Sequence, residues 1–330
     1  MIIFCSGIHG NGGKDYLARF TKHCEKHGKK VKIYSIGSMV FDQAKQMGIS
    51  LSANNILNTS PVTLKALRAA VFERILGDKD KYDTILIDSH ATFFWNRVFI
   101  NAFDWEYITR LSPDLFVTVI DCTGDIRRRL TSAQQWKDQG ISNKEILLWQ
   151  NVEVNNTQGL AEQGRKPYYV IPARQHENTL YRLIFHPEMK PIYASYPMTN
   201  LKNPANKKLV DDFVKKMNEY FVVFDPGTIE VEEPNDDDKD VVFNHIVHRD
   251  IYWLIGQSDK VIAFMPEIVY TSGVDSELKE AHETNKDVWM VFPHKNYGPF
   301  THYYNQKVFS SINELVDFIE GRGYEAKIEN

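Results

Sequence analysis

The stretch SGIHGNGGKD, from Ser6 to Asp15, joins a short apolar run to an amphipathic segment and keeps most of the spacing of a phosphate-binding loop. Such a loop has the pattern G-x-x-x-x-G-K-[ST], in which backbone amides surround phosphate oxygens, the lysine neutralises them and the hydroxyl holds magnesium. The glycines of the stretch are Gly7, Gly10, Gly12 and Gly13. Gly13 occupies the lysine position and Lys14 the hydroxyl position. We therefore predict a phosphate-binding turn at a helix N-terminus that lacks the hydroxyl for magnesium.

Two other interpretations of this stretch remain open. The extra glycine can be an insertion, which makes Lys14 the phosphate lysine and leaves Asp15 where the hydroxyl belongs. Alternatively, the glycines only allow a tight turn between a strand and a helix, and no phosphate binds there. In both registers that bind phosphate, the residue that should hold magnesium is neither serine nor threonine.

Short apolar runs alternate with helix-like segments along the first half of the chain. The runs are IIFCSG, VKIYSIG, YDTILIDSH, DLFVTVIDC and KPYYVIPA, which begin at residues 2, 31, 82, 114 and 166. Buried parallel strands separated by helices give this pattern, and their ligands bind at the carboxyl ends of the strands. We predict an α/β domain with a P-loop NTPase-like parallel sheet over residues 1–187.

The same alternation restarts after FHPEMKP, where Pro187 and Pro191 punctuate a short polar bridge. The apolar runs KPIYASYP (190–197), YFVVFDPG (220–227), DKVIAFMP (259–266) and DVWMVFPH (287–294) alternate with helix-like segments at 204–219, 241–257 and 274–285. We predict a second, smaller α/β domain of the doubly wound, flavodoxin-like type over residues 188–330. The acidic tract at 230–240 is predicted to be a solvated loop.

Composition favours small-molecule partners. The chain has 330 residues, of which 43% are hydrophobic and 25% charged, and a formal charge of -4, which gives no general attraction to nucleic acid or to anionic membranes. Cys5, Cys24 and Cys122 are widely spaced, so neither a disulfide framework nor a metal site is predicted. With no apolar run of about 18 residues and no signal-like N-terminus, we expect a cytoplasmic protein.

The first half, over most of residues 1–180, resembles the archaeal-type adenylate kinases. The matching pieces are SGIHGNGG, VKIYSIGSMVFDQAKQMG, ILIDSHAT and LSPDLFVTVIDCTGDIRRRL, in the family order. The resemblance implies that the loop glycines and Lys14 bind ATP or another nucleotide, with Asp88 near magnesium and the phosphates. It also implies a charge clamp on the phosphoryl groups, made of Arg127, Arg128 and Arg129. A solvated helix face is the alternative for these arginines.

Departures from that family leave the activity of this half open. The family places threonine where this chain has Lys14, its arginine-rich lid is reduced here to QQWKDQG with Lys137, and the segment after DSHAT diverges. Phosphoryl transfer depends on positioned cations and on closure against water. The domain is therefore either a nucleoside monophosphate kinase or a nucleotide sensor without turnover, and the need for Mg²⁺ stays open.

In the second half, the motif SGVDSELKEA at 272–281 follows a buried strand and a loop. Its turn and N-cap residues predict a helix with Glu277 in the first turn, at the carboxyl edge of the sheet. A carboxylate there has two possible roles: it can be a catalytic group, or it can simply complement the helix dipole.

Residues of about 190–295 resemble the nucleoside 2-deoxyribosyltransferases and their nucleotide N-hydrolase relatives. The matching pieces are PIYASYP, HRDIYWLIGQSDKVIAFMP and SGVDSELKEA. The resemblance implies that Glu277 is the nucleophile that attacks the anomeric carbon, that Asp250 contacts the departing base, and that Tyr193 lies near the sugar. Further candidates to line the sugar or a 5'-phosphate are Ser195, Tyr196 and Asn200.

Plainer roles remain open for two of these residues. Asp250 can form an ion pair with Arg249, and Tyr193 can be an interior aromatic residue whose hydroxyl needs a polar partner. If Glu277 only complements the helix dipole, the second half is a binding or scaffold module without activity.

Taken together, the two resemblances imply an enzyme of nucleotide metabolism. It would cleave or exchange the N-glycosidic bond of a (deoxy)nucleoside or nucleoside monophosphate through Glu277, and its kinase-like half would bind, and in one version phosphorylate, a nucleotide. In the alternative, that half is a non-catalytic sensor that regulates a glycohydrolase acting on NAD or a signal nucleotide. The expected partners are nucleosides, nucleotides and further copies of the chain, and neither nucleic acid nor a membrane.

Overall fold

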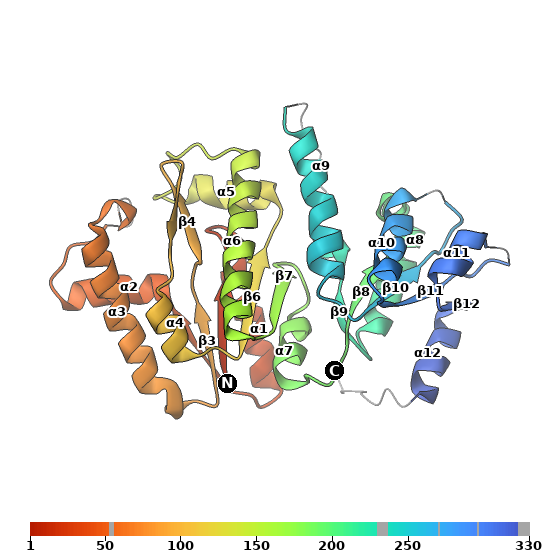
Figure 1. Cartoon of the computed structure of the whole chain (residues 1–330), viewed down its shortest axis with the longest axis horizontal. Coiled ribbons are helices and arrows are strands. Elements are labelled where there is room, and N and C mark those ends of the chain that lie inside the picture. Colours follow the sequence, from red (N-terminus) through yellow and green to blue (C-terminus); the bar gives the residue numbers. More distant parts are fainter. Residues whose placement is uncertain (53–55, 230–236, 270, 296, 323–330) are drawn as a thin grey trace. The chain divides into compact units, whose positions relative to one another are not determined.

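The computed structural model describes residues 1–52, 56–229, 237–269, 271–295 and 297–322 (Figure 1). The chain divides into two compact units, Met1–Glu177 with Ile229–Phe243, and Asn178–Thr228 with the residues from Asn244 onward. Apart from Glu177, helix α7 (Glu177–Phe185) belongs to the second unit, where Arg182 donates to the backbone oxygen of Phe221 at 2.9 Å. The domain boundary at 187/188 stays a prediction. The acidic tract falls mostly outside the described residues.

The first unit contains a five-stranded parallel sheet in the order β2-β3-β1-β6-β7. Its strands are β1 (Ile2–Ser6), β2 (Val31–Ser35), β3 (Thr84–Asp88), β6 (Leu115–Ile120) and β7 (Tyr168–Pro172). Because β1 lies between β3 and β6, the loop after β1 emerges in the middle of the carboxyl edge of the sheet. In this register Cys5 is paired with Asp88 on β3. The predicted parallel α/β architecture is confirmed.

Helices cover this sheet and bury its apolar side chains. They are α1 (Gly13–Lys26), α2 (Ile36–Gln46), α3 (Pro61–Asp78), α4 (Trp105–Leu111), α5 (Thr123–Ser132) and α6 (Asn143–Gly164), with short 3-10 turns η1 (Ile56–Asn58) and η2 (Lys79–Lys81). One core cluster joins Phe4 and Phe116 of the sheet to Val40 of α2, Val71 of α3 and Leu160 of α6. None of the described helices is both long enough and apolar enough to cross a bilayer.

An antiparallel hairpin follows β3, where the sequence did not predict one. Strands β4 (Thr92–Trp95) and β5 (Val98–Asn101) are joined by Asn96 and Arg97, whose φ angles are 50° and 65°. A two-residue turn with positive φ at both positions usually carries glycine at the second. Because the second position is Arg97 and not glycine, residue preferences do not predict this turn.

The second unit contains another five-stranded parallel sheet, in the order β12-β11-β10-β8-β9. Its strands are β8 (Pro191–Ser195), β9 (Val222–Phe224), β10 (Lys260–Phe264), β11 (Asp287–Val291) and β12 (Lys307–Phe309). Counted from β8, this is the doubly wound 2-1-3-4-5 order, and the chain reverses its direction of winding between β8 and β10. The predicted second α/β sheet is confirmed, and its ligands are expected at that reversal.

Helices and short turns fill the connections of the second sheet. They are η3 (Met198–Lys202), α8 (Pro204–Met217), η4 (Pro226–Thr228), α9 (Lys239–His248), η5 (Arg249–Ile255), α10 (Ser272–Glu283), α11 (Pro299–Tyr304) and α12 (Ile312–Gly321). The predicted helix over 241–257 is therefore two consecutive elements, because η5 is a π-helix that follows α9 directly. Its wider turns change which side chains face the sheet.

Candidate functional site

The glycine-rich loop between β1 and α1 is held in a phosphate-loop shape by local contacts. Gly12 precedes α1 with φ +76°, and a Cβ atom there would lie 3.0 Å from the Cβ of Ala173. Asn11 closes the turn, since its Oδ1 accepts from the Gly13 amide at 3.0 Å and its Nδ2 donates to the Val119 carbonyl at 2.8 Å. Because α1 begins at Gly13, Lys14 is its second residue, which is the hydroxyl position of the standard pattern.

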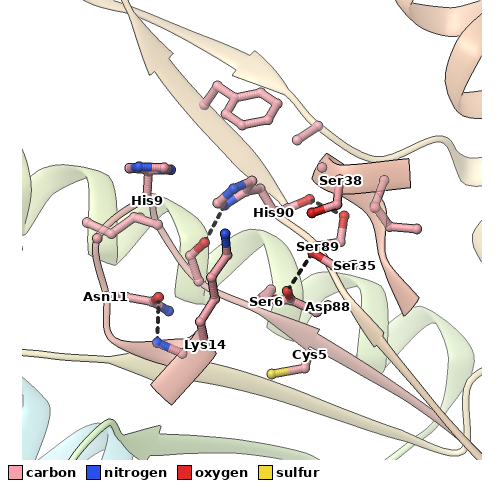
Figure 2. A pocket seen from close by; sticks show the side chains of 18 of the residues that line it. Cys5, Ser6, His9, Asn11, Lys14, Ser35, Ser38, Asp88, Ser89 and His90 are labelled. Atoms are coloured by element: carbon pink, nitrogen blue, oxygen red, sulfur yellow. Dashed lines mark hydrogen bonds between the residues drawn. The ribbon is translucent and has the colours of Figure 1, made fainter. Parts of the chain in front are cut away.

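A cavity of about 450 Å³ lies beside this loop (Figure 2). Residues 7–14 form one side of it, and the other lining comes from α2, α3, β3 and the segments that follow β3 and α5. The lining side chains that could bind a ligand or take part in a reaction include Lys14, Arg68, Asp88, His90, Phe93 and Arg129. Loop glycines, a helix N-terminus and cationic side chains around one cavity are the features that accommodate a nucleotide phosphate.

Asp88 and Lys14 are two of the charged residues that line this cavity. Ser35 donates to Asp88 Oδ2 at 3.1 Å, and burial raises the pKa of Asp88, while the charges of His90 and Lys14 oppose that rise. His90 donates through Nδ1 to the Gly7 carbonyl at 2.5 Å. Burial lowers the pKa of His90 and lowers that of His9 to about 4, so both rings are neutral at pH 7.

Glu153 of α6 holds the loop in place through a hydrogen bond to the Gly7 amide, a role that the sequence did not predict. This fully buried carboxylate accepts from the amides of Gly7 and Ala91 at 2.9 and 2.8 Å, and from Thr92 at 2.7 Å. Burial raises its pKa to about 8, and the three amide donors oppose the rise. The available signal was an acid on the apolar face of a helix, one turn from the buried Trp149.

The three predicted arginines of α5 differ in where they lie. Arg129 lines the cavity, donates to the Gly10 carbonyl at 2.8 Å and pairs with Asp121 at 2.7 Å. Arg127 and Arg128 are exposed, and Arg128 pairs with Asp125 at 2.7 Å. The described lining of the cavity includes neither of them. A part for Arg127 and Arg128 in phosphate binding stays a prediction.

The residues at the loop do not fit a magnesium ion in the standard way, because Lys14 stands where a hydroxyl ligand is needed. Within the described part of the chain, one group has metal-ligand spacing, formed by Asp121, Cys122 and Asp125. Both of its carboxylates are in ion pairs with arginines, Asp121 with Arg129 and Asp125 with Arg174 at 2.5 Å. That cluster is better described as a network of ion pairs than as a cation site.

In the second unit, Glu277 is held by two hydroxyl groups of β8. Tyr193 donates to Glu277 Oε1 at 2.9 Å and Ser195 donates to Oε2 at 2.5 Å. Tyr193 and Ser195 are fully buried and alternate along the strand, so they share one face of the sheet. Helix α10 is capped by Thr271, which puts Glu277 in the second turn and not in the predicted first turn.

Asp250 of η5 completes this group. Its two carboxylate oxygens pair with the buried Arg249 at 2.8 and 3.2 Å, so the predicted ion pair is present. Its charge acts on both Tyr193 and Glu277. Burial raises the pKa of Glu277 to about 8, the Ser195 and Tyr193 hydrogen bonds oppose that rise, and Asp250 adds to it. The three residues predicted as catalytic therefore lie together at the β8–β10 reversal.

The other candidates of the second unit lie elsewhere. The Tyr196 hydroxyl bonds to Asp225 and accepts from the Gly227 amide at 3.1 Å, so it is engaged away from Glu277. The Asn200 side chain lies outside the described residues. Arg68 of α3, which the sequence did not single out, lines the cavity of the first unit with its guanidinium 5.8 Å from the Phe93 ring centre.

Comparisons with known proteins concern mainly the first unit. A family model described as an AAA domain matches residues 6–146. The adenylate kinase of Thermococcus kodakarensis is 24% identical over 190 residues, which is 57% of this chain and 88% of that protein. The adenylate kinase of Thermococcus onnurineus is 26% identical over 139 residues, which is 42% of this chain and 68% of that protein. The N-terminal part of the chain is an adenylate kinase-like P-loop domain.

A solved structure of deoxyadenosine kinase from M. mycoides, with the products dCMP and a flexible dCDP bound, also aligns with the chain. Its TM-score is 0.34 and its sequence identity is 16%. The alignment covers 57% of this chain and 98% of that chain.

Proposed function

We propose that the first unit binds ATP or a related nucleotide at residues 7–14 and transfers its terminal phosphoryl group to a nucleoside monophosphate or nucleoside. The observation that carries this proposal is the loop, closed by Asn11 and supported by Glu153, at the N-terminus of α1 beside a cavity. The backbone amides there would hold phosphate oxygens, and Arg129, which bonds to the Gly10 carbonyl and lines the cavity, would add positive charge. The adenylate kinases that share this part of the chain support the reaction class.

The acceptor would occupy the part of the cavity lined by α2 and α3. Phe41 and Phe93 offer apolar rings to a base, and Arg68 offers a cation to a phosphate. A non-reacting sensor would use the same donor pocket without an ordered acceptor. The two versions therefore differ in turnover and not in donor binding.

Turnover is tested by incubating the whole protein with ATP and each nucleoside monophosphate or deoxynucleoside, and separating the nucleotides by chromatography. Formation of ADP that depends on the acceptor supports the kinase. ATP binding without acceptor-dependent ADP contradicts the kinase and favours the sensor. Absence of any bound nucleotide contradicts both.

For the second unit, we propose cleavage or exchange of the N-glycosidic bond of a (deoxy)nucleoside or its monophosphate, with Glu277 as the nucleophile. The observation that carries this proposal is the carboxylate held by Tyr193 and Ser195, next to Asp250, at the reversal of the sheet. Two hydroxyl donors fix the orientation of the carboxylate and favour its charged form, which is the form that attacks.

In the reaction, one Glu277 oxygen bonds to C1' while the bond between C1' and the base nitrogen breaks. The electron pair of that bond stays on the base, which takes up a proton as it leaves. Asp250 would contact the base, with its orientation fixed by Arg249. Water, or a second base, then attacks C1' and releases the Glu277 carboxylate. The first acceptor gives hydrolysis and the second gives exchange.

The substrate class is tested by incubating the protein with deoxynucleosides, their monophosphates and NAD, and separating released bases by chromatography. Addition of a second, labelled base distinguishes exchange from hydrolysis, because only exchange gives a labelled nucleoside. Release from NAD alone would favour the version in which a sensor regulates a glycohydrolase. Release from none of these compounds would contradict the proposal for this unit.

A further inference from the structure

We infer that Lys14 takes the place of the magnesium ion at this phosphate loop, so that the first unit binds nucleotide phosphates without a divalent metal. In the standard loop, the hydroxyl at this position and an acid at the end of a neighbouring strand hold the ion against the phosphates. Here the acid is present as Asp88 and the hydroxyl is replaced by an ammonium group. The inference rests on the nucleotide binding proposed for the same loop.

Lys14 is exposed, and it also lines the cavity beside the loop. Lys14 is the second residue of α1, it lines the cavity, and in Figure 2 its side chain rises from the loop toward His90. Its charge acts on Asp88 and on His90. Asp88 ends β3 directly beside β1 and lines the same cavity as Lys14, so both residues border the space where the ion of a standard loop would be bound.

Other basic side chains of the cavity have contacts of their own. His90 is bonded through Nδ1 to the Gly7 carbonyl, and the Arg68 guanidinium lies 5.8 Å from the Phe93 ring centre. Arg129 is paired with Asp121. Across the described residues, Lys14 has no ion-pair partner within 4.0 Å. A compact ammonium with three donors binds phosphate oxygens as a point charge, and it would repel a divalent ion placed beside it.

The experiment measures the affinity of the full chain for ADP by titration calorimetry, in excess MgCl₂ and in excess EDTA. We expect the wild-type dissociation constant to differ by less than about threefold between the two buffers. Lys14→Thr restores the standard hydroxyl, so its affinity should fall about tenfold or more in EDTA and recover in MgCl₂. Lys14→Arg keeps the positive charge and should bind ADP in EDTA nearly as well as the wild type.

Lys26→Thr is the matched control, because it removes one lysine from the exposed end of the same helix and leaves the cavity unchanged. It should behave like the wild type in both buffers. A wild-type protein that binds ADP in MgCl₂ but not in EDTA would overturn the inference and leave nucleotide binding intact. Lys14→Thr that binds equally in both buffers would also overturn it. Failure of the wild type to bind ADP in either buffer would overturn nucleotide binding and this inference together.

Discussion

Both candidate sites lie at the carboxyl edge of a five-stranded parallel sheet, yet one is built mainly from backbone and the other from side chains. In the first unit, the loop after β1 relies on backbone amides and on glycine conformations, with side chains such as Asn11 and Glu153 acting as supports. In the second, the group around Glu277 consists of side chains from β8, η5 and α10. A site made of backbone amides is sensitive to a Cβ atom added at one of its glycines. A site made around a carboxylate is sensitive to the loss of that one functional group.

The largest expected effect separates the two sites through Glu277. Glu277→Gln removes the nucleophile and keeps the size of the side chain, so base release should fall by about a thousandfold or more. ADP affinity should stay unchanged. Glu283→Gln, an exposed acid of the same helix, is the control and should retain full base release. The rates are measured by chromatography of released base, and retention of activity in Glu277→Gln would refute the nucleophile.

Gly12→Ala tests the dependence of the first site on its backbone. Alanine at φ +76° costs about 1–2 kcal/mol, and its Cβ would stand 3.0 Å from Ala173 and 3.3 Å from the Arg129 guanidinium. We expect ADP to bind about tenfold more weakly, with base release unaffected. Gly159→Ala, whose added Cβ meets no heavy atom within 4 Å, is the matched control. Equal ADP affinity in Gly12→Ala would mean that the loop does not contact the phosphates.

The smallest expected effect concerns the pH dependence of base release. The attacking form of Glu277 is the carboxylate, so the rate should rise with pH through its pKa of about 8 and level off above it. Ser195→Ala removes a donor that favours the charged form, which raises this pKa and moves the midpoint upward by about one pH unit. Tyr193→Phe should move it in the same direction.

A rate profile in both variants, recorded from pH 6 to 10, checks this prediction. A midpoint that moves downward, or that stays fixed in both variants, would mean that the hydroxyl groups do not hold the ionised carboxylate. Nucleotide affinity over the same pH range serves as the control, because the hydrogen bonds of Tyr193 and Ser195 to Glu277 lie within the second unit.

Sequence patterns were sufficient for the five strands of the first sheet, for the loop and for four strands of the second sheet, because each depends on local spacing, but strand β12 was not predicted. Alternation along PIYAS places Tyr193 and Ser195 on one face, and the glycine spacing places the turn before α1. The prediction that Glu277 lies in the first helical turn was wrong: it lies in the second turn, because Thr271 and not a later residue caps the helix. Helix starts are marked by several competing cap residues here, and only the folded backbone selects one.

What the sequence could not supply are contacts between distant residues. Glu153 accepts a hydrogen bond from the Gly7 amide, which is 146 positions away in the chain, and the local sequence around either residue does not predict this contact. The hairpin at 92–101 depends on an arginine with positive φ, which residue preferences disfavour. The sequence did not distinguish Arg129 from Arg127 and Arg128. In the folded helix α5, Arg129 bonds to the loop, whereas Arg128 pairs with Asp125.

The π-helical winding of η5 determines the direction in which Asp250 points, so a change in that winding would change the second site. Its ladder contains the bond from the Gly256 amide to the Ile251 carbonyl at 3.1 Å, five residues apart, so its turn holds one residue more than an α-turn. Deleting a single residue there, such as the exposed Tyr252, would restore α-helical spacing and rotate Asp250 by about 100° relative to β10. We expect the sheet to survive that deletion. If Asp250 contacts the departing base as proposed, the deletion of one codon would remove that contact and leave the fold in place.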